Sequence, residues 1–178
     1  MPLTARPYRI FLSHSAHDKG LVEGVAAQLQ AVGVEVYLYE EHTEPGRSIP
    51  QKLQEAIRDS DALVALLTPA SGHRPFVHEE IGFALGSGKQ AVALLTTDVA
   101  DPDVLGMLQG EYIRLDPADP WDGMSKLLAF LHGQQAALQQ QADAAARAAQ
   151  RELAQAIATL AVLLLIAYAL SKPTSGSA

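Results

Sequence analysis

Short apolar runs alternate with amphipathic helical patterns along residues 1–132. This alternation is typical of a parallel sheet wrapped by helices, and nearly continuous apolar runs fit strands that are buried on both faces. The pattern predicts a flavodoxin-like α/β domain, and such a fold does not by itself define a function. The five expected strands are Tyr8–Ser13, Val34–Glu40, Ala62–Thr68, Ala91–Thr96 and Tyr112–Leu115.

The helices expected between these strands have recognisable ends. Ser15 and Asp18 have the spacing of a capping box at the start of the first helix, and Gly33 is expected to end it. The second helix is predicted to begin at Ser48 with Pro50 in its first turn. Two further helices are predicted, the third over about 75–85 and the fourth after residue 121.

The composition changes to Gln and Ala after His132. These residues favour a helix but offer little apolar surface to bury, so we predict a solvated helical spacer, with a weakly oligomerising helix as the alternative. Leu153–Leu170 follow, eighteen residues whose only polar members are Gln155, Thr159 and the amphipathic Tyr168. At about 1.5 Å per residue this helix would span roughly 27 Å, close to the hydrocarbon thickness of a bilayer. We predict a transmembrane helix; the alternative is a helix buried all round in an oligomer core.

The pattern therefore predicts five parts of the chain. Arg147 and Arg151 precede the apolar segment and only Lys172 follows it, which favours the folded domain on the cytoplasmic side of the membrane. The first residues have no apolar run typical of a cleaved secretory signal. We expect a single-pass membrane protein consisting of an N-terminal segment (1–7), an α/β domain (8–132), a Gln/Ala-rich helical linker (133–152), a transmembrane helix (153–170) and a short polar tail (171–178).

Charge and composition exclude several kinds of ligand. Residues 1–132 hold 10 Lys or Arg against 18 Asp or Glu, and an acidic domain without a basic stripe argues against nucleic acid as a partner. Cysteine is absent, which excludes disulfides and the usual thiolate zinc sites. His14 and His17 are the closest pair of histidines and have no third ligand nearby in sequence, so no metal site is expected.

Three segments resemble motifs of TIR (Toll/interleukin-1 receptor) domains. The first predicted strand, Arg9-Ile-Phe-Leu-Ser-His-Ser15, is similar to the opening box of these domains. The loop from Glu40 to Ile49, with Glu44-Pro-Gly-Arg-Ser48, resembles their BB loop, including its Pro-Gly. The most specific likeness is Phe76-Val-His-Glu-Glu-Ile-Gly-Phe-Ala84, which is similar to the Trp-x-x-x-Glu helix of bacterial NAD-cleaving TIR domains. Together these segments extend the resemblance over residues 8 to about 132.

The resemblance implies cleavage of the bond between nicotinamide and ribose in NAD, with Glu80 at the position of the catalytic glutamate. One acid can suffice, because nicotinamide is cationic while attached and leaves as a neutral pyridine that needs no protonation. An ionised carboxylate would stabilise the positive charge that grows on the ribose. The alternative for Glu79 and Glu80 is a purely structural role, in which their negative charges suit the dipole near the start of a helix.

Helical spacing places Phe76, Glu80 and Phe83 on one face of the third helix, so Glu80 would emerge between two aromatic rings. The opposite positions are expected to face the core: Val77, Ile81, Ala84 and Leu85. In this segment the chain departs from the family pattern, since Phe76 replaces the usual Trp and lacks an indole hydrogen bond.

The remaining substrate-binding residues are expected at the ends of the first two strands. The resemblance implies that Ser13, His14 and Ser15 help to hold the dinucleotide, at the sheet edge where open α/β folds bind ligands. Ser15 has an alternative role as a helix cap. The acid that the family often has at the end of the second strand falls on Tyr39 here, with Glu40 beside it.

Arg47 in the loop after the second strand is expected to meet a phosphate or a neighbouring subunit, or to be a solvated loop charge. NAD would be the substrate, no metal or organic cofactor is implied, and the product is either ADP-ribose or a cyclic form. The resemblance suggests bacterial immune signalling against phage, activated by self-association of TIR domains and with an effector or sensor protein as a further partner. The alternative from another class is a membrane-tethered TIR scaffold without catalysis.

A response-regulator-like receiver is disfavoured, because Ser13-His14-Ser15 occupies the place of its acidic pair. The C-terminal tail fits both the enzyme and the scaffold. Anchoring in two dimensions promotes assembly by raising the effective concentration of the domain. The tail has two other possible roles, placing the domain beside a membrane partner or acting on the bilayer itself.

Overall fold

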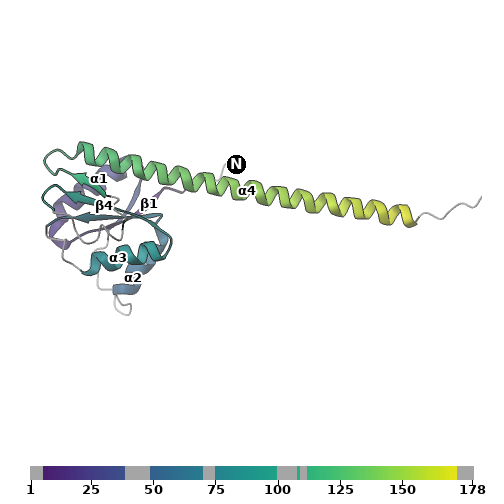
Figure 1. Cartoon of the computed structure of the whole chain (residues 1–178), viewed down its shortest axis with the longest axis horizontal. Coiled ribbons are helices and arrows are strands. Elements are labelled where there is room, and N and C mark those ends of the chain that lie inside the picture. Colours follow the sequence, from purple (N-terminus) through teal and green to yellow (C-terminus); the bar gives the residue numbers. More distant parts are fainter. Residues whose placement is uncertain (1–5, 39–48, 70–74, 100–107, 109–111, 172–178) are drawn as a thin grey trace, which may run out of the picture. The chain divides into compact units, whose positions relative to one another are not determined.

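The computed structural model describes residues 6–38, 49–69, 75–99, 108 and 112–171 (Figure 1). Within these ranges the side chains of residues 49–50, 75–76, 169 and 171 are left aside. The chain consists of two compact units, Met1–Gln134 and Gln135–Ala178. The first unit carries the sheet and all of the residues expected at the site, and the second is helical.

A five-stranded parallel sheet of order β2-β1-β3-β4-β5 forms the centre of the first unit. β1 lies between β2 and β3, with Ile10 opposite both Val36 and Ala62. The structure therefore confirms the predicted flavodoxin-like α/β fold with a parallel sheet. The strands are β1 (Arg9–Ser13), β2 (Glu35–Leu38), β3 (Ala62–Leu67), β4 (Gln90–Thr96) and β5 (Tyr112–Leu115).

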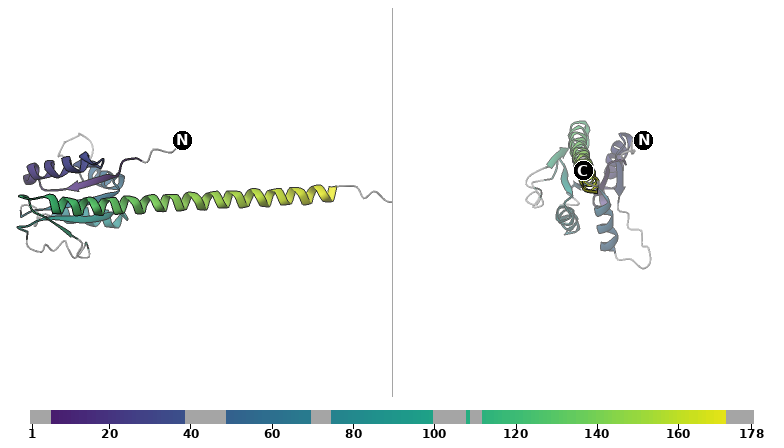
Figure 2. Two further views of the ribbon diagram at one scale, coloured as in Figure 1. Left: turned by 90° about the horizontal axis from the view of Figure 1, so that it is seen from above. Right: turned by 90° about the vertical axis from the view of Figure 1, so that its right-hand side faces the viewer.

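Helices cover both faces of this sheet (Figures 1 and 2). One core cluster joins the sheet to α1 and the start of α4, and a second joins the other face to α2 and α3. Within β1, Ile10 and Leu12 belong to the first cluster and Phe11 to the second, as the alternation of a strand requires. The helices are the 3₁₀ helix η1 (Ala16–Asp18), α1 (Lys19–Ala31), α2 (Ile49–Asp59), α3 (Pro75–Gly86) and α4 (Trp121–Ser171).

Two details around α1 test the expected helix signals. Gly33 has a φ of 87° and its amide donates to the Gln30 carbonyl, so this glycine ends the helix as predicted. The predicted capping box is wrong. The Ser15 hydroxyl accepts from the amide of His17 and caps η1, and the Asp18 side chain makes no cap hydrogen bond.

The face of α3 that packs on the sheet is narrower than expected. Val77, Ile81 and Ala84 are buried, as their spacing predicts. Leu85 is 38% exposed, so its expected place in the core is wrong. Leu85 is one residue beyond Ala84, which places it about 100° further around the helix. The sheet covers only the part of the α3 surface that faces the sheet.

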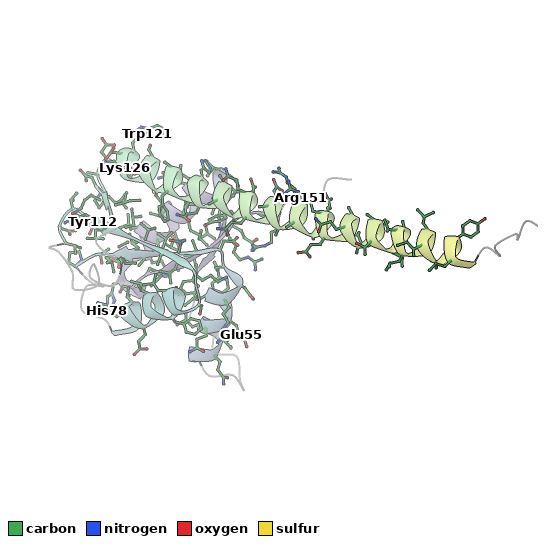
Figure 3. All side chains as sticks on the ribbon, turned by 45° about the vertical axis from the view of Figure 1, so that its right-hand side comes forward. Glu55, His78, Tyr112, Trp121, Lys126 and Arg151 are labelled. Carbon is green, nitrogen blue, oxygen red and sulfur yellow. The ribbon has the colours of Figure 1, made fainter. Side chains whose placement is uncertain are left out.

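α4 is one continuous helix of 51 residues, which contains the expected fourth helix, the Gln/Ala-rich linker and the apolar segment. From Ala136 to Tyr168 its side chains are exposed, and those beyond Arg151 project around the helix (Figure 3). This helix is long and apolar enough to cross a membrane, and none of its apolar window is buried inside the structure.

Gly123 lies where the first turn of α4 touches β5, and its replacement tests this contact. A Cβ atom there would lie 2.6 Å from the Arg114 carbonyl oxygen and 3.1 Å from the Leu115 Cα. Because both are backbone atoms, we expect Gly123→Ala to lower the free energy of unfolding by about 1–3 kcal/mol. Gly24, in the middle of α1, is the matched control: its Cβ would meet nothing, so Gly24→Ala should raise that free energy by about 0.5–1 kcal/mol. Unfolding of the full chain by circular dichroism measures both, and equal effects would contradict the close approach.

Candidate active site

The candidate site lies at the carboxyl edge of the sheet, where β1 ends. Ser13 is the last residue of β1, and the chain turns there through His14 and Ser15 into η1. A pocket of about 30 Å³ opens beside this turn and is lined by Phe11, Leu12, Ser13, His14 and Glu80. The structure thus brings together three residues that the sequence analysis expected at the site, from β1, its following turn and α3.

Packing of α3 explains why Glu80 reaches this pocket. Val77, Ile81 and Ala84 hold one face of the helix against the sheet. Glu80 lies at the border of that face and is partly buried, whereas the neighbouring Glu79 is exposed. Of the two adjacent glutamates, only Glu80 lines the pocket.

The Glu80 carboxyl has an unusual proton affinity. Burial raises its pKa from 4.5 to about 7, because the ionised form loses hydration. The Ser13 hydroxyl lies close enough to lower the pKa, and the negative charge of Glu79 raises it further. About half of the Glu80 side chains are therefore protonated at neutral pH, so the site holds both a carboxylate and a carboxylic acid.

Ser13 and His14 face the same pocket with different hydrogen bonding. Ser13 is buried, and its hydroxyl has no hydrogen-bond partner of good geometry among the described residues, despite its closeness to Glu80. The Nδ1 atom of His14 lies 3.1 Å from the Leu12 carbonyl oxygen. Since a carbonyl only accepts, Nδ1–H donates to it, which leaves Nε2 of a neutral ring with a free lone pair.

The other expected residues are placed elsewhere or lie outside the described residues. Ser15 is buried, but its hydroxyl caps η1 at 3.3 Å from the His17 amide, and Ser15 does not line the pocket. The ring of Phe83 is partly buried against the core and lies 5.1 Å from the Arg58 guanidinium carbon. The backbone of Phe76 lies in the first turn of α3, and its side chain is not described. Three further residues that were predicted at the site lie outside the described residues: Tyr39, Glu40 and Arg47.

A hydrogen bond that the sequence analysis missed joins the turn after β1 to the end of β3. The Thr68 hydroxyl donates to Asp18 Oδ2 at 2.9 Å. At the end of β4, the Thr96 hydroxyl similarly contacts Asp98. Each threonine stands at the end of an otherwise apolar run, which is the one sequence signal for these contacts.

A larger pocket of about 410 Å³ lies at the opposite, amino edge of the sheet, lined by Arg6, Pro7, Arg9, Glu35, Arg58 and Asp59. Arg9 pairs there with Glu35, and Arg6 with Asp61. These pairs leave little net charge, and no residue expected at the site lines this pocket, so we place the chemistry at the smaller one. Among the residues that the structure describes, no group of three or more His, Asp or Glu has the arrangement of a metal site.

Comparison with solved structures finds several to which this chain is similar. The TIR domain of a Toll-related receptor from Hydra magnipapillata is 15% identical, with 69% of this chain and 97% of that chain covered and a TM-score of 0.56. The CMP N-glycosidase of Clostridium botulinum is 23% identical over 67% of this chain and 97% of that chain, with a TM-score of 0.49. The TIR domains of the activated Roq1 resistosome are 19% identical over 71% and 81%, with a TM-score of 0.46.

Sequence comparison assigns the family. No curated protein matches the sequence. The family model described as the TIR domain matches residues 10–128, which run from the second residue of β1 through the other four strands to the start of α4. The likeness to the Hydra receptor domain agrees with this match at the level of the fold. This chain belongs to the TIR domain family.

Proposed function

We propose that this TIR domain cleaves the N-glycosidic bond between nicotinamide and ribose in NAD. The observation that carries the proposal is the partly buried Glu80 carboxyl in a pocket with Ser13 and His14, at the carboxyl edge of the sheet. Ligands of open α/β folds bind at this edge, and a strongly shifted pKa in a cleft is typical of a functional group. The likeness of the α3 segment to NAD-cleaving TIR domains supports the same role for Glu80.

The chemistry needs one carboxylate. When the C1–N bond of NAD breaks, its electron pair stays on the nicotinamide nitrogen, which becomes neutral, and positive charge develops on the ribose. An ionised Glu80 beside that carbon opposes the charge, more strongly than in water because the site is partly buried. Water then adds to give ADP-ribose, or a nucleophile within the same molecule adds to give a cyclic product.

The raised pKa of Glu80 favours a second candidate, the cleavage of nucleotides whose base is uncharged. Such a base is a poor leaving group unless it is protonated as it departs. A carboxylic acid that is half protonated at neutral pH can supply this proton as a general acid. The two substrate classes use opposite protonation states of Glu80, and their pH dependence separates them.

The C-terminal helix completes the proposal. We infer that the apolar part of α4 crosses a membrane with Arg147 and Arg151 on the cytoplasmic side, next to the TIR domain. Anchoring in one plane raises the effective concentration of the domains and promotes their self-association. A role in bacterial antiphage immunity, with an effector or sensor protein as partner, fits an enzyme whose activity depends on assembly.

Glu80→Gln tests the enzyme, with Glu79→Gln as the matched control on the next residue. We expect Glu80→Gln to lower nicotinamide release from NAD by about 10²–10³-fold, because the amide cannot oppose charge on the ribose. Glu79 is exposed, so its variant should change the rate by less than about threefold. The measurement uses the purified full chain at high density in liposomes. Wild-type protein that releases no nicotinamide under any assembly condition would indicate a TIR scaffold without catalysis.

The pH profile tests which form of Glu80 acts. Cleavage of NAD requires the carboxylate, so kcat/KM should rise through pH 7, from roughly a tenth of its plateau at pH 6 to a constant value above pH 8. A nucleotide with an uncharged base should show the opposite slope. Glu79→Gln should move the midpoint to lower pH, because the charge of Glu79 raises the pKa of Glu80. A flat profile between pH 5.5 and 9 would rule out both roles for this carboxyl.

Lysine substitutions in α4 test the membrane span. Val162→Lys combined with Leu165→Lys places two charges in the middle of the apolar segment, each costing roughly 3 kcal/mol at the centre of a bilayer. We expect the wild type to resist extraction from membranes by alkaline carbonate and the double variant to be released. Gln140→Lys, in the Gln/Ala-rich part of α4, is the control and should leave extraction unchanged. Release of the wild type itself would show that α4 does not span the bilayer.

A further inference from the structure

The buried hydroxyl of Ser13 has a role that its place in the sheet does not explain. Ser13 is only 2% exposed, and its Oγ atom has no hydrogen-bond partner of good geometry among the described residues, although it lies close to the Glu80 carboxyl. An unpaired buried hydroxyl is costly, and native proteins usually satisfy such a group with protein or an ordered water molecule. Ser13 lines the pocket that contains Glu80. The hydroxyl therefore marks a place for a small hydrogen-bonding molecule.

The size of the pocket limits what this molecule is. Its volume is about 30 Å³. A polar cavity holds a water molecule once it exceeds roughly 10–15 Å³ and offers two to four polar partners, whereas sites that enclose a ligand of moderate size measure roughly 300–1,000 Å³. The partners here are the Ser13 hydroxyl, the Glu80 carboxyl and the His14 ring, and the apolar wall comes from Phe11 and Leu12. Volume and chemistry both fit water.

We propose that this pocket binds the water molecule that attacks the ribose, and that Ser13 positions it. The inference rests on the proposed NAD cleavage and names the nucleophile and the product. As the C1–N bond breaks with its electrons on nicotinamide, a lone pair of the water oxygen forms the new bond to C1. One water proton passes to the ionised Glu80 and then to solvent, so that NAD and water yield nicotinamide, ADP-ribose and a proton.

The geometry also favours hydrolysis over other fates of the ribose cation. Glu80 from α3 and Ser13 from β1 line the same small pocket, so water held there has both a proton acceptor and a hydrogen-bond partner. A carboxylate whose proton affinity matches the working pH is an effective general base. A pyridine base or the adenine of the same molecule attacks with the lone pair of a ring nitrogen and has no proton to pass to Glu80, so its attack does not use this assistance. The expected main product is open-chain ADP-ribose.

Competition between water and an added base tests the inference. In base exchange, a pyridine such as 3-acetylpyridine replaces nicotinamide at C1, and this reaction does not use the water pocket. We expect Ser13→Ala to lower the ratio of ADP-ribose to exchanged dinucleotide by about five- to tenfold, the effect of one lost hydrogen bond. An unchanged ratio, or an equal loss of both products, would overturn the role of Ser13 in binding water.

Ser60→Ala is the matched control. Ser60 is equally buried, its hydroxyl donates to the Ala56 carbonyl at 2.9 Å, and it lies between α2 and β3, away from the pocket. In Ser60→Ala the ratio of ADP-ribose to exchanged dinucleotide should equal that of the wild type. A shift of this ratio like that expected for Ser13→Ala would also overturn the inference. Ser13→Cys keeps a side chain of similar size with a weak donor, and gives the same test if the alanine variant folds poorly.

The two proposals fail in distinguishable ways. If wild-type protein releases no nicotinamide, NAD cleavage is wrong and the role of the water pocket fails with it. If the wild type releases nicotinamide and the ratio in Ser13→Ala and Ser13→Cys is unchanged, only the water pocket is wrong and Glu80 keeps its role.

Discussion

The common direction of the five strands is the constraint on which the candidate site depends. Because both faces of the sheet are covered by helices, the strands hold almost only apolar residues along their length. In the three central strands, β1, β3 and β4, polar side chains therefore stand only at the strand ends, and the parallel direction brings the carboxyl ends of these strands to one edge. Ser13, Thr68 and Thr96 each stand at the end of a buried strand, and each is buried itself. The candidate site lies at this edge because the apolar interior of the domain leaves no room for its polar side chains.

The partial burial of Glu80 at this edge lowers the stability of the fold at neutral pH. Its pKa in the folded state, about 7, exceeds the ordinary value of 4.5, so the contribution of this group to stability is present below pH 4.5 and is lost as the pH rises through 7. Ionisation at neutral pH then costs up to about 3 kcal/mol, of which the nearby Ser13 hydroxyl relieves a part. The apolar face of α3 holds the carboxyl in place against this cost. A residue that destabilises its own fold and still lies at a pocket is typical of function rather than of structure.

The sequence predicts the parts of this architecture that depend on local patterns. Apolar runs locate the strands, and Gly33 ends α1 because its positive φ suits glycine. The meeting of Ser13 with Glu80 follows from the direction of parallel strands once α3 is located. By contrast, Asp18 bonds to Thr68, fifty residues away, instead of capping its own helix, and no local pattern encodes such a partner. Whether Ser13 or Ser15 faces the pocket depends on the backbone conformation of the turn after β1. The types of residue in this turn do not determine that conformation.

The size of the pocket argues that catalysis needs more than the residues that line it. A cavity of about 30 Å³ holds water, whereas sites that enclose a ligand of moderate size measure roughly 300–1,000 Å³. A dinucleotide bound for the proposed cleavage would therefore lie over the opening of the pocket, along the carboxyl edge. β2 and β3 flank β1 in the sheet, and their last residues, Leu38 and Leu67, lie at this edge. For the proposed cleavage, the remaining walls must therefore come from outside the lining of this pocket, and a neighbouring copy brought close by assembly on a membrane can supply them.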